Sequence, residues 1–343
     1  MKVLKQITMV SIGLVVAASA LQAREQIKIV GSSTVYPFSS YVAEELGSTT
    51  KLPTPVVEST GSGGGMKLFC AMNGMNTPDI TNASRPMKVK EWKLCQKNGV
   101  TDITGVMLGY DGIVVAQSKD NKPMDLTRKQ LLLAVAEKVP VDGKLVPNPY
   151  KKWSDVDASL PDREIVIYGP PTSSGTRDAF EELVMEKVSK KMEGYAKKKY
   201  KMIRQDGVYI PSGENDNLIV QKLDKNKKAL GIFGYSFLAE NADKIVASKI
   251  DGVVASPATV ADASYPIARS LYFYIKNSHV PKVKAIRAYV DLFLSEKMIG
   301  DDGVLTTIGL IPAEKSIREK MRENAKNLTP LTLEMVEAKK VTK

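Results

Sequence analysis

The chain has 343 residues, enough for two domains of ordinary size, and its 43% hydrophobic and 25% charged residues are typical of a globular protein. Its formal net charge of +11 favours anionic partners in general, but the basic clusters lack the interleaved aromatic residues of RNA-binding proteins. Two cysteines and one histidine leave little for a zinc site, which usually takes three or four such ligands. We therefore expect no nucleic-acid partner, no metal and no cofactor.

The N-terminus has the features of a signal peptide over residues 1–23. Two lysines form a basic region, 7–18 is apolar, and small residues precede cleavage after Ala23, with Ala20 as the other choice. The apolar stretch is too short for a comfortable membrane span, and no later run is long and apolar enough to cross a bilayer. We expect an exported, soluble mature protein.

Three joints of one type follow, each a short apolar strand, a loop of small and polar residues, and a helix. None of the loops matches a Walker A or a Rossmann fingerprint. The first joint has a strand at 27–30, the loop Gly31–Thr34 and a helix to Leu46; the second has a strand at 55–58, the loop Ser59–Gly65 and a helix over 66–72; the third runs from 78–83 through Ser84-Arg85-Pro86 to a helix over 89–96.

A fourth joint lies at 165–188, where the strand Ile165–Tyr168 precedes PPTSSGT and an amphipathic helix. A helix start leaves about four N–H groups unpaired and carries positive potential, so Arg177 is unusual there. A bound anion would explain it, and the alternative is an ordinary N-cap with a surface arginine. Because ligands of open α/β sheets bind beyond the carboxyl ends of the strands, the four loops can converge on one cleft that offers hydroxyls and two arginines.

Asp111 and Gly112 interrupt the apolar run 106–117. An aspartate there is costly unless it is paired. The pair is either a turn or a functional feature, with Asp111 beside the cleft arginines or accepting a hydrogen bond from the ligand. The remaining elements that we expect are helices at 127–139, 182–204, 218–223 and 283–294, a loop at 148–155, buried strands at 229–235 and 268–275, and helices to the C-terminus.

Cys70 and Cys95 form an even pair in a chain that we expect to be exported, which favours a disulfide over two buried free thiols. The single histidine, His279, stands in a polar loop and is predicted to lie on the surface. No GxSxG or HExxH motif is present. The chain is thus rich in neutral donors and poor in general bases, which favours holding an oxyanion over cleaving a bond.

The four strand–loop–helix joints and the strands around Asp111 and at 229–235 closely resemble the phosphate-binding proteins of bacterial phosphate ABC transporters, the PstS family. The resemblance implies a type II periplasmic-binding-protein fold, with two α/β lobes, a two-segment hinge and a cleft between them. It implies a monomeric periplasmic binder, not an enzyme, that delivers inorganic phosphate to inner-membrane permease subunits. Lobe 1 would comprise 24–110 and 265–343, and lobe 2 would comprise 111–264. The motifs that carry it are GSSTVYPF (31–38), STGSGGGMK (59–67), DITNASRPMK (79–88), GYDGIVVA (109–116), PPTSSGTRDAFEE (170–182) and GIFGYSFL (231–238).

The resemblance also implies the ligand-binding residues. Two positions depart from the best-known enterobacterial pattern: Arg85 stands where that pattern has an aspartate, and Pro170 where it has an arginine. Arg177 is similar to another branch and would replace the missing arginine. The matching positions are Ser33, Thr34, Ser62, Ser174, Gly175 and Thr176.

A carboxylate in the cleft would accept the proton of phosphate and reject sulfate. Asp111 is our candidate for this acceptor, and Asp79, Glu58 and Asp216 are the alternatives. The other possible functions are binding of sulfate, molybdate or a phosphonate, or a secreted phosphatase on the same fold.

Overall fold

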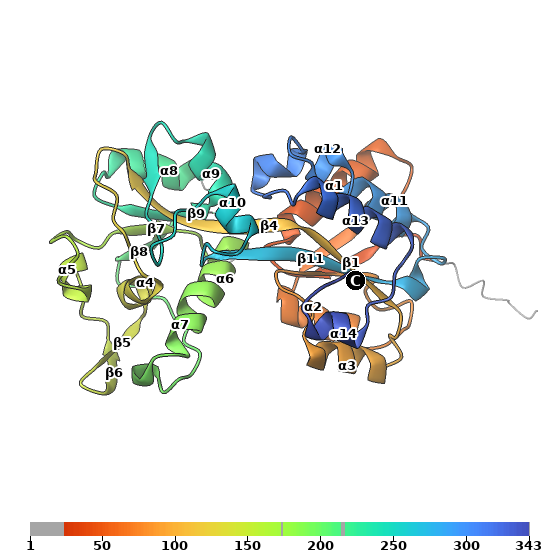
Figure 1. Cartoon of the computed structure of the whole chain (residues 1–343), viewed down its shortest axis with the longest axis horizontal. Helices are drawn as coiled ribbons and strands as arrows, with labels where there is room; N and C mark the ends of the chain where they lie inside the picture. Colours follow the sequence, from red (N-terminus) through yellow and green to blue (C-terminus); the bar gives the residue numbers. More distant parts are fainter. Residues whose placement is uncertain (1–23, 173, 214–216, 343) are drawn as a thin grey trace, which may run out of the picture.

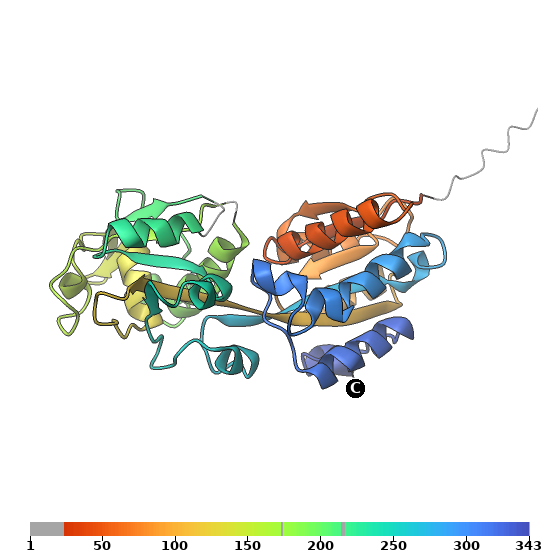
Figure 2. The same ribbon diagram turned by 90° about the horizontal axis from the view of Figure 1, so that it is seen from above.

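A computed structural model describes residues 24–172, 174–213 and 217–342. The predicted signal peptide lies outside these residues. Within the described part of the chain, no helix is both long and apolar enough to span a bilayer. The molecule is elongated, with two α/β halves at the two ends of its long axis and two strands, β4 (Ile103–Ser118) and β11 (Ala268–Lys276), running between them (Figures 1 and 2).

The first lobe, as we call the half around one hydrophobic core, contains most of the N- and C-terminal parts of the chain. Its strands β2, β1 and β3 are parallel, so their carboxyl ends lie at one edge, and β11 continues the sheet in the antiparallel direction. Its elements are β1 (Lys28–Gly31), α1 (Tyr36–Thr49), β2 (Val56–Ser59), α2 (Gly61–Phe69), β3 (Ile80–Ala83), α3 (Val89–Lys97), the 3-10 helices η3 (Asn277–His279) and η4 (Val304–Ile308), α11 (Ala285–Phe293), α12 (Glu296–Ile299), α13 (Lys315–Lys326) and α14 (Leu333–Glu337).

The second lobe surrounds a separate core, which includes Trp153, Phe180 and Phe233. Its strands follow the order β4, β9, β7, β8, and β10 pairs with β4. Its elements are α4 (Arg128–Val135), the hairpin β5 (Lys138–Val141) and β6 (Lys144–Pro147), α5 (Trp153–Val156), β7 (Ile167–Gly169), α6 (Gly175–Phe180), the π-helix η1 (Glu181–Glu186), α7 (Lys187–Ser189), the 3-10 helix η2 (Glu193–Tyr195), β8 (Tyr209–Pro211), α8 (Asn217–Lys225), β9 (Leu230–Gly234), α9 (Tyr235–Glu240), β10 (Ile245–Ala247) and α10 (Pro257–Ala261).

The two long strands take part in both halves, since β4 pairs with β11 and with β9. Asp111 lies inside β4 opposite Arg269 of β11, so of the two interpretations of Asp111-Gly112 the turn is wrong. The strand continues because Arg269 supplies the partner that a buried carboxylate needs. The exact lobe boundaries at 110/111 and 264/265 stay a prediction.

Several expected helix limits are also wrong, and the helix expected over 127–139 ends at Val135, before β5 begins at Lys138. The second helix begins at Gly61, inside the glycine run, and not at Met66. Gly65 packs there so tightly that a Cβ would lie 2.5 Å from the Cα of Gly31, so the residues that look like a flexible loop permit a close helix–strand approach.

The lysine-rich helix expected over 182–204 ends at Ser189. The chain then turns through η2, with Ala196 and Lys197 in the left-handed region, and buries Tyr195. The sequence periodicity did not reveal this turn, because lysines are compatible with both helix and exposed loop.

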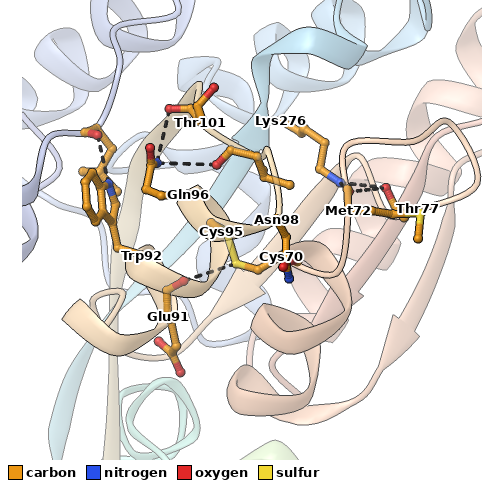
Figure 3. The surroundings of a disulfide bond; sticks show 12 residues. Cys70, Met72, Thr77, Glu91, Trp92, Cys95, Gln96, Asn98, Thr101 and Lys276 are labelled. Atoms are coloured by element: carbon orange, nitrogen blue, oxygen red, sulfur yellow. Dashed lines mark hydrogen bonds between the residues drawn. A yellow bond between two sulfur atoms is a disulfide. The ribbon is translucent and has the colours of Figure 1, made fainter.

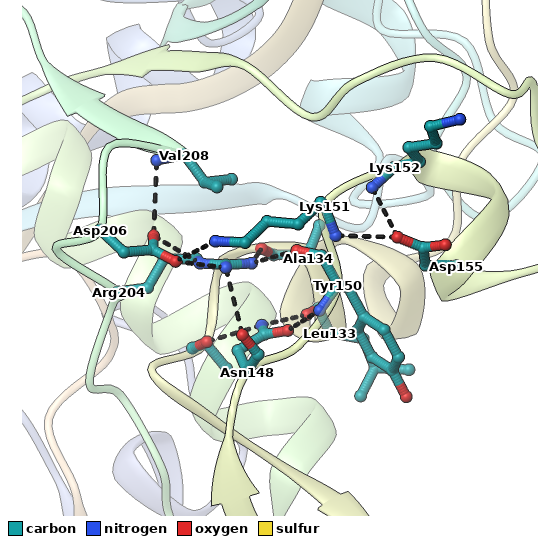
Figure 4. Close-up of polar contacts among 11 residues, drawn as sticks. Leu133, Ala134, Asn148, Tyr150, Lys151, Lys152, Asp155, Arg204, Asp206 and Val208 are labelled. Atoms are coloured by element: carbon teal, nitrogen blue, oxygen red, sulfur yellow. Dashed lines mark hydrogen bonds and ion pairs between the residues drawn. The ribbon is translucent and has the colours of Figure 1, made fainter.

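Arg204, in the segment that follows this turn, forms hydrogen bonds to other parts of the second lobe (Figure 4). Its buried guanidinium donates to the carbonyls of Ala134, Asn148 and Tyr150 and to both carboxylate oxygens of Asp206. The hydrogen bond from Arg204 is the largest of the influences that lower the pKa of Asp206 below its usual range.

Candidate functional site

The loops at the carboxyl ends of β1, β2 and β3 meet helix residues of the second lobe around a cavity of about 270 Å³. The first lobe supplies small residues, hydroxyls and cations, and the second supplies carboxylates and two lysines. The residues that line the cavity are Ser32, Ser33, Thr34, Gly61, Ser62, Gly63, Ser84, Arg85, Lys88, Asp178, Glu181, Glu182, Glu186, Lys199, Lys201 and Arg269.

The first loop reaches across to the second lobe. Ser33 donates its hydroxyl hydrogen to the carboxylate of Asp178, and Thr34 donates to the carbonyl oxygen of Gly175 at 3.1 Å. A Cβ on Gly175 would lie 2.5 Å from the backbone of Thr34, so this contact requires glycine. The two lobes therefore touch through Thr34 and Gly175 at one edge of the site.

The second and third loops join through their serines. The Ser62 hydroxyl lies 3.1 Å from that of Ser84 and accepts a hydrogen bond from the Ser84 backbone N–H at 3.0 Å. Ser62 belongs to the first turn of α2, whose N-cap residue Thr60 makes no side-chain cap. The N–H groups of that turn have no intrahelical acceptors, so this end of α2 is suited to an anion.

Arg85 is held in place by a carboxylate of its own lobe. Its two terminal nitrogens donate to Glu91 at 2.9 and 2.7 Å, and Glu91 also accepts from the backbone N–H of Lys88. Burial opposes the charge of Arg85, but the hydrogen bonds and charge of Glu91 outweigh it and raise the pKa of Arg85 above its usual value. Arg85 thus faces the cavity as an oriented cation.

The predicted residues of the fourth joint lie next to the cavity and do not line it. Ser174 caps the six-residue helix α6 by accepting from the backbone N–H of Thr176. Arg177 is only 6% exposed, donates to Glu181 at 2.8 Å and stacks over the ring of Tyr209. In this arrangement Arg177 lies behind the wall of the site that Glu181 forms.

Arg269 is a cavity residue that the sequence analysis missed. It donates to Asp111 at 3.3 Å and to the Gly175 carbonyl at 3.2 Å, and its Nη2 also donates to the Thr34 hydroxyl. It therefore links one of the long strands to a loop from each lobe. The missed signal was an arginine inside the apolar run 268–275, which is as costly unpaired as Asp111 is inside 106–117.

Asp111 does not line the cavity. Burial is the largest influence on the pKa of Asp111 and raises it, and the positive charge and hydrogen bond of Arg269 counteract this only in part. Its side chain is 11% exposed and that of Arg269 6%, so the two form a largely buried ion pair between the long strands. Of the alternative acceptors, Asp79 and Glu58 do not line the cavity either, and Asp216 lies outside the described residues.

The carboxylates that do line the cavity stand on α6 and η1. Glu181 pairs with Arg177 and Lys201, Glu186 with Lys199, and Glu182 lies 3.8 Å from Arg269. The wider turn of a π-helix is frequent at functional sites, and here it carries three of these four carboxylates. The second-lobe wall is therefore acidic but internally neutralised.

The predicted disulfide between Cys70 and Cys95 is confirmed and joins the C-terminal end of α2 to α3 (Figure 3). Asn98 donates to the carbonyl of Cys70 at 2.8 Å beside it. The same α3 carries Glu91, which orients Arg85. The bridge therefore fixes the helix behind Ser62 relative to the helix behind Arg85.

His279 is fully buried, so its predicted place on the surface is wrong. Its Nδ1 lies 2.6 Å from Asp79, which also accepts from Arg24 at 2.6 Å. Asp79 precedes β3, whereas Ser84 follows it, so this cluster lies at the opposite end of the strand from the cavity. In the described residues, no group of three or more His, Cys, Asp or Glu side chains could hold a metal ion.

Comparison with known proteins gives consistent matches. Residues 16–297 match the model of the PBP superfamily domain. The chain is 32% identical to protein SphX of Synechococcus elongatus over 77% of its length and 72% of that protein, and 31% identical to the phosphate-binding protein PstS of Staphylococcus saprophyticus over 79% and 76%. A crystal structure of a possible phosphate-binding protein from Planctomyces limnophilus superposes with a TM-score of 0.73 at 31% identity, covering 89% of this chain and 98% of that one.

Proposed function

The chain belongs to the PstS family of phosphate-binding proteins, and from that premise we propose that it captures inorganic phosphate in the central cavity and delivers it to an ABC-type permease. The fold is the expected two-lobe periplasmic-binding-protein fold. The observation that carries the proposal is the first-lobe wall, where the uncapped start of α2, the Ser62 and Ser84 hydroxyls and the oriented Arg85 face one cavity. These groups are donors and cations, as an oxyanion requires.

The proposed contact set contains Ser33, Thr34, Ser62, Arg85 and, added from the structure, Arg269. Ser174, Gly175 and Thr176 would join it through the start of α6. Arg177 would act from behind by holding Glu181 and that helix. Closure would take place by bending of β4 and β11, since these two strands connect the lobes.

For the rejection of sulfate we propose that two carboxylates have different roles. Asp111 supports the charge and direction of Arg269. Asp178 lines the cavity and already accepts a hydrogen bond from Ser33, so it is the better placed of the two to accept the proton of phosphate. Asp178 is exposed in this structure. If closure of the lobes buries it, an ionised Asp178 would face sulfate with lone pairs only, a mismatch that costs about 1–3 kcal/mol per unpaired buried group.

We propose binding without catalysis, in the periplasm and after removal of the signal peptide. This is supported by the burial of the one histidine of the chain against Asp79, away from the cavity. Two of the cavity carboxylates, Glu186 and Glu181, are already paired with Lys199 and Lys201. A phosphatase on this fold is the competing function.

The test is calorimetric titration of the exported protein with phosphate, sulfate, molybdate and a phosphonate, together with an assay for phosphate-ester hydrolysis. We expect tight binding of phosphate alone and no turnover. Phosphate at about 100 times its dissociation constant should stabilise the fold by about 2.7 kcal/mol in a thermal-shift experiment. If sulfate, molybdate or the phosphonate binds more tightly than phosphate, that anion is the ligand and the proposal of phosphate is wrong. If the protein hydrolyses the ester and this activity disappears in Arg85→Ala, the protein is an enzyme and not a binder.

A further inference from the structure

A second hollow, of about 480 Å³, lies on the second lobe between the start of α4 and the residues at the end of α7. Four lysines line it: Lys129, Lys187, Lys190 and Lys191. We call it the lysine groove. All four are exposed, and they come from two helical segments that are distant in sequence.

The charge of the lysine groove is uncompensated. Its one lining carboxylate, Asp251, is already engaged by Arg128, whose Nε and backbone N–H donate to it at 2.6 and 2.9 Å. Within the described residues, none of the four lysines has a carboxylate at salt-bridge distance. Positive charge thus accumulates around a hollow that no protein anion fills.

Neighbouring lysines of the same lobe are arranged differently. Lys199 pairs with Glu186, Lys201 with Glu181, and Lys197 with Glu193. The absence of partners in the groove is therefore a local feature and does not extend to these nearby lysines.

The groove adjoins the central cavity along one helical segment. Glu182 and Glu186 of η1 line the cavity, and Lys187 follows directly in α7. Lys187 is exposed at the surface, but partial desolvation by its neighbours, together with the positive charges of Arg128, Arg269 and Lys191, lowers its pKa, although Glu182 opposes this. An anion in the groove would relieve the mutual repulsion of these cations.

The lysine ammonium groups bind phosphates as point charges, without the fixed geometry of arginine. A group of four suits a ligand that carries more charge than one orthophosphate. We propose that the lysine groove is a second anion site, separate from the central cavity, that takes multiply charged phosphate, either as free condensed phosphate or as the phosphate headgroups of a membrane surface.

The experiment compares two variants that lose the same charge. In the groove variant Lys129, Lys187, Lys190 and Lys191 are changed to Gln. In the control variant Lys122, Lys144, Lys225 and Lys228, which are exposed lysines elsewhere on the second lobe, are changed to Gln. The free probe is inorganic tripolyphosphate, measured by calorimetry at low and high salt. The membrane probe is co-sedimentation with phosphatidylcholine vesicles with and without phosphatidylglycerol.

We expect the groove variant to bind at least one probe about tenfold more weakly than the wild type, because several charge-assisted contacts are lost, while the control variant stays near the wild type. A selective loss with tripolyphosphate identifies free condensed phosphate, and a selective loss with anionic vesicles identifies headgroups. The orthophosphate affinity of the groove variant should not change, which shows that its fold and cavity are intact.

Three results would overturn the proposal. The wild type binds neither probe, the groove variant binds both probes no more weakly than the control variant, or tripolyphosphate binding is lost in Arg85→Ala and kept in the groove variant while vesicle binding is also kept. The last result would place the probe in the central cavity. Failure of orthophosphate binding alone would affect the proposed function and leave this site unaffected.

Discussion

The two walls of the central cavity differ in how their charges are held. On the first lobe, hydroxyls, helix N–H groups and Arg85 face the cavity, and Glu91 and the disulfide hold them from within the same lobe. On the second lobe, carboxylates face the cavity, and cations beside them neutralise their charge. Ser62, Ser84 and Arg85 form a preformed anion site, because each is held by partners of its own lobe. Ser33 and Thr34 of the same wall differ, since they donate to Asp178 and Gly175 of the second lobe. The second wall is suited to selecting which anion stays, since a carboxylate accepts a hydrogen bond from a protonated oxyanion and repels an unprotonated one.

Arg269 is the residue whose loss would break this comparison, because it contacts loops of both walls. Arg269→Met should lower the free energy of unfolding by about 3–5 kcal/mol, since it leaves Asp111 buried without its partner. Urea denaturation measures this. The double variant with Asp111→Leu should regain most of the stability and still bind phosphate weakly. If the single variant is as stable as the wild type, the pair does not support the long strands.

The disulfide tests whether the first wall is held from within its own lobe. Replacing Cys70 and Cys95 by Ser should cost about 3 kcal/mol of unfolding free energy, because the bridge closes a loop of 24 intervening residues. Phosphate affinity should fall in the same variant when measured well below its unfolding temperature. Unchanged affinity would mean that Ser62 and Arg85 keep their relative positions without the bridge.

Arg85 and Arg177 sharpen the comparison, since one lines the cavity and the other lies behind its wall. Arg85→Ala should weaken phosphate binding roughly tenfold to a hundredfold, the equivalent of about 1.5–3 kcal/mol for a charged hydrogen bond. Arg177→Ala should weaken it less and should lower the stability of the second lobe. Calorimetric titration of both variants with phosphate measures the two losses of affinity. A larger loss in Arg177→Ala would mean that Arg177, and not Arg85, contacts the phosphate directly.

Asp178 and Asp111 test the selective role of the second wall. Asp178→Asn should weaken phosphate binding and shift the phosphate-to-sulfate preference by about tenfold toward sulfate, because the amide can donate to sulfate. Asp111→Asn is the matched control behind the cavity, where the carboxylate pairs with Arg269, and it should change this ratio less. Competition titration with sulfate measures both. A shift confined to Asp111→Asn would return the acceptor role to Asp111.

The smallest effect concerns Asp206, which supports the second lobe away from the cavity. Arg204 holds the folded-state pKa of Asp206 below its unfolded value of about 3.9, so its stabilising contribution is full above that pH and decreases as the pH falls toward the folded pKa. Asp206→Asn should therefore flatten the acid side of the stability profile. An unchanged profile, measured by thermal unfolding between neutral and acidic pH, would show that the pair contributes nothing.

The strand–loop–helix joints were predictable from sequence because short β-branched runs, small hydroxylic loops and amphipathic helices each leave a local pattern. The observed β1, β2, β3, β9 and β11 lie within about two residues of their expected positions. The meeting of these loops around one cavity was also predictable, because the carboxyl ends of parallel strands lie at one edge of the sheet.

The misses have a common cause, which is that long-range partners leave no local pattern. Arg269 and Asp111 are each costly alone and become favourable only through pairing between strands far apart in sequence. His279 lies in a polar stretch, yet Asp79 gives it a buried partner. The helix that was expected to continue after Ser189 ends there because the chain turns to bury Tyr195.

A crystal structure of the exported protein grown with phosphate tests the central claim most directly. The account predicts one phosphate in the central cavity, within hydrogen-bond distance of the first turn of α2, Arg85 and Arg269, with Asp178 turned from Ser33 toward the ligand. Phosphate bound elsewhere, with these donors facing only solvent and their own carboxylates, would contradict it.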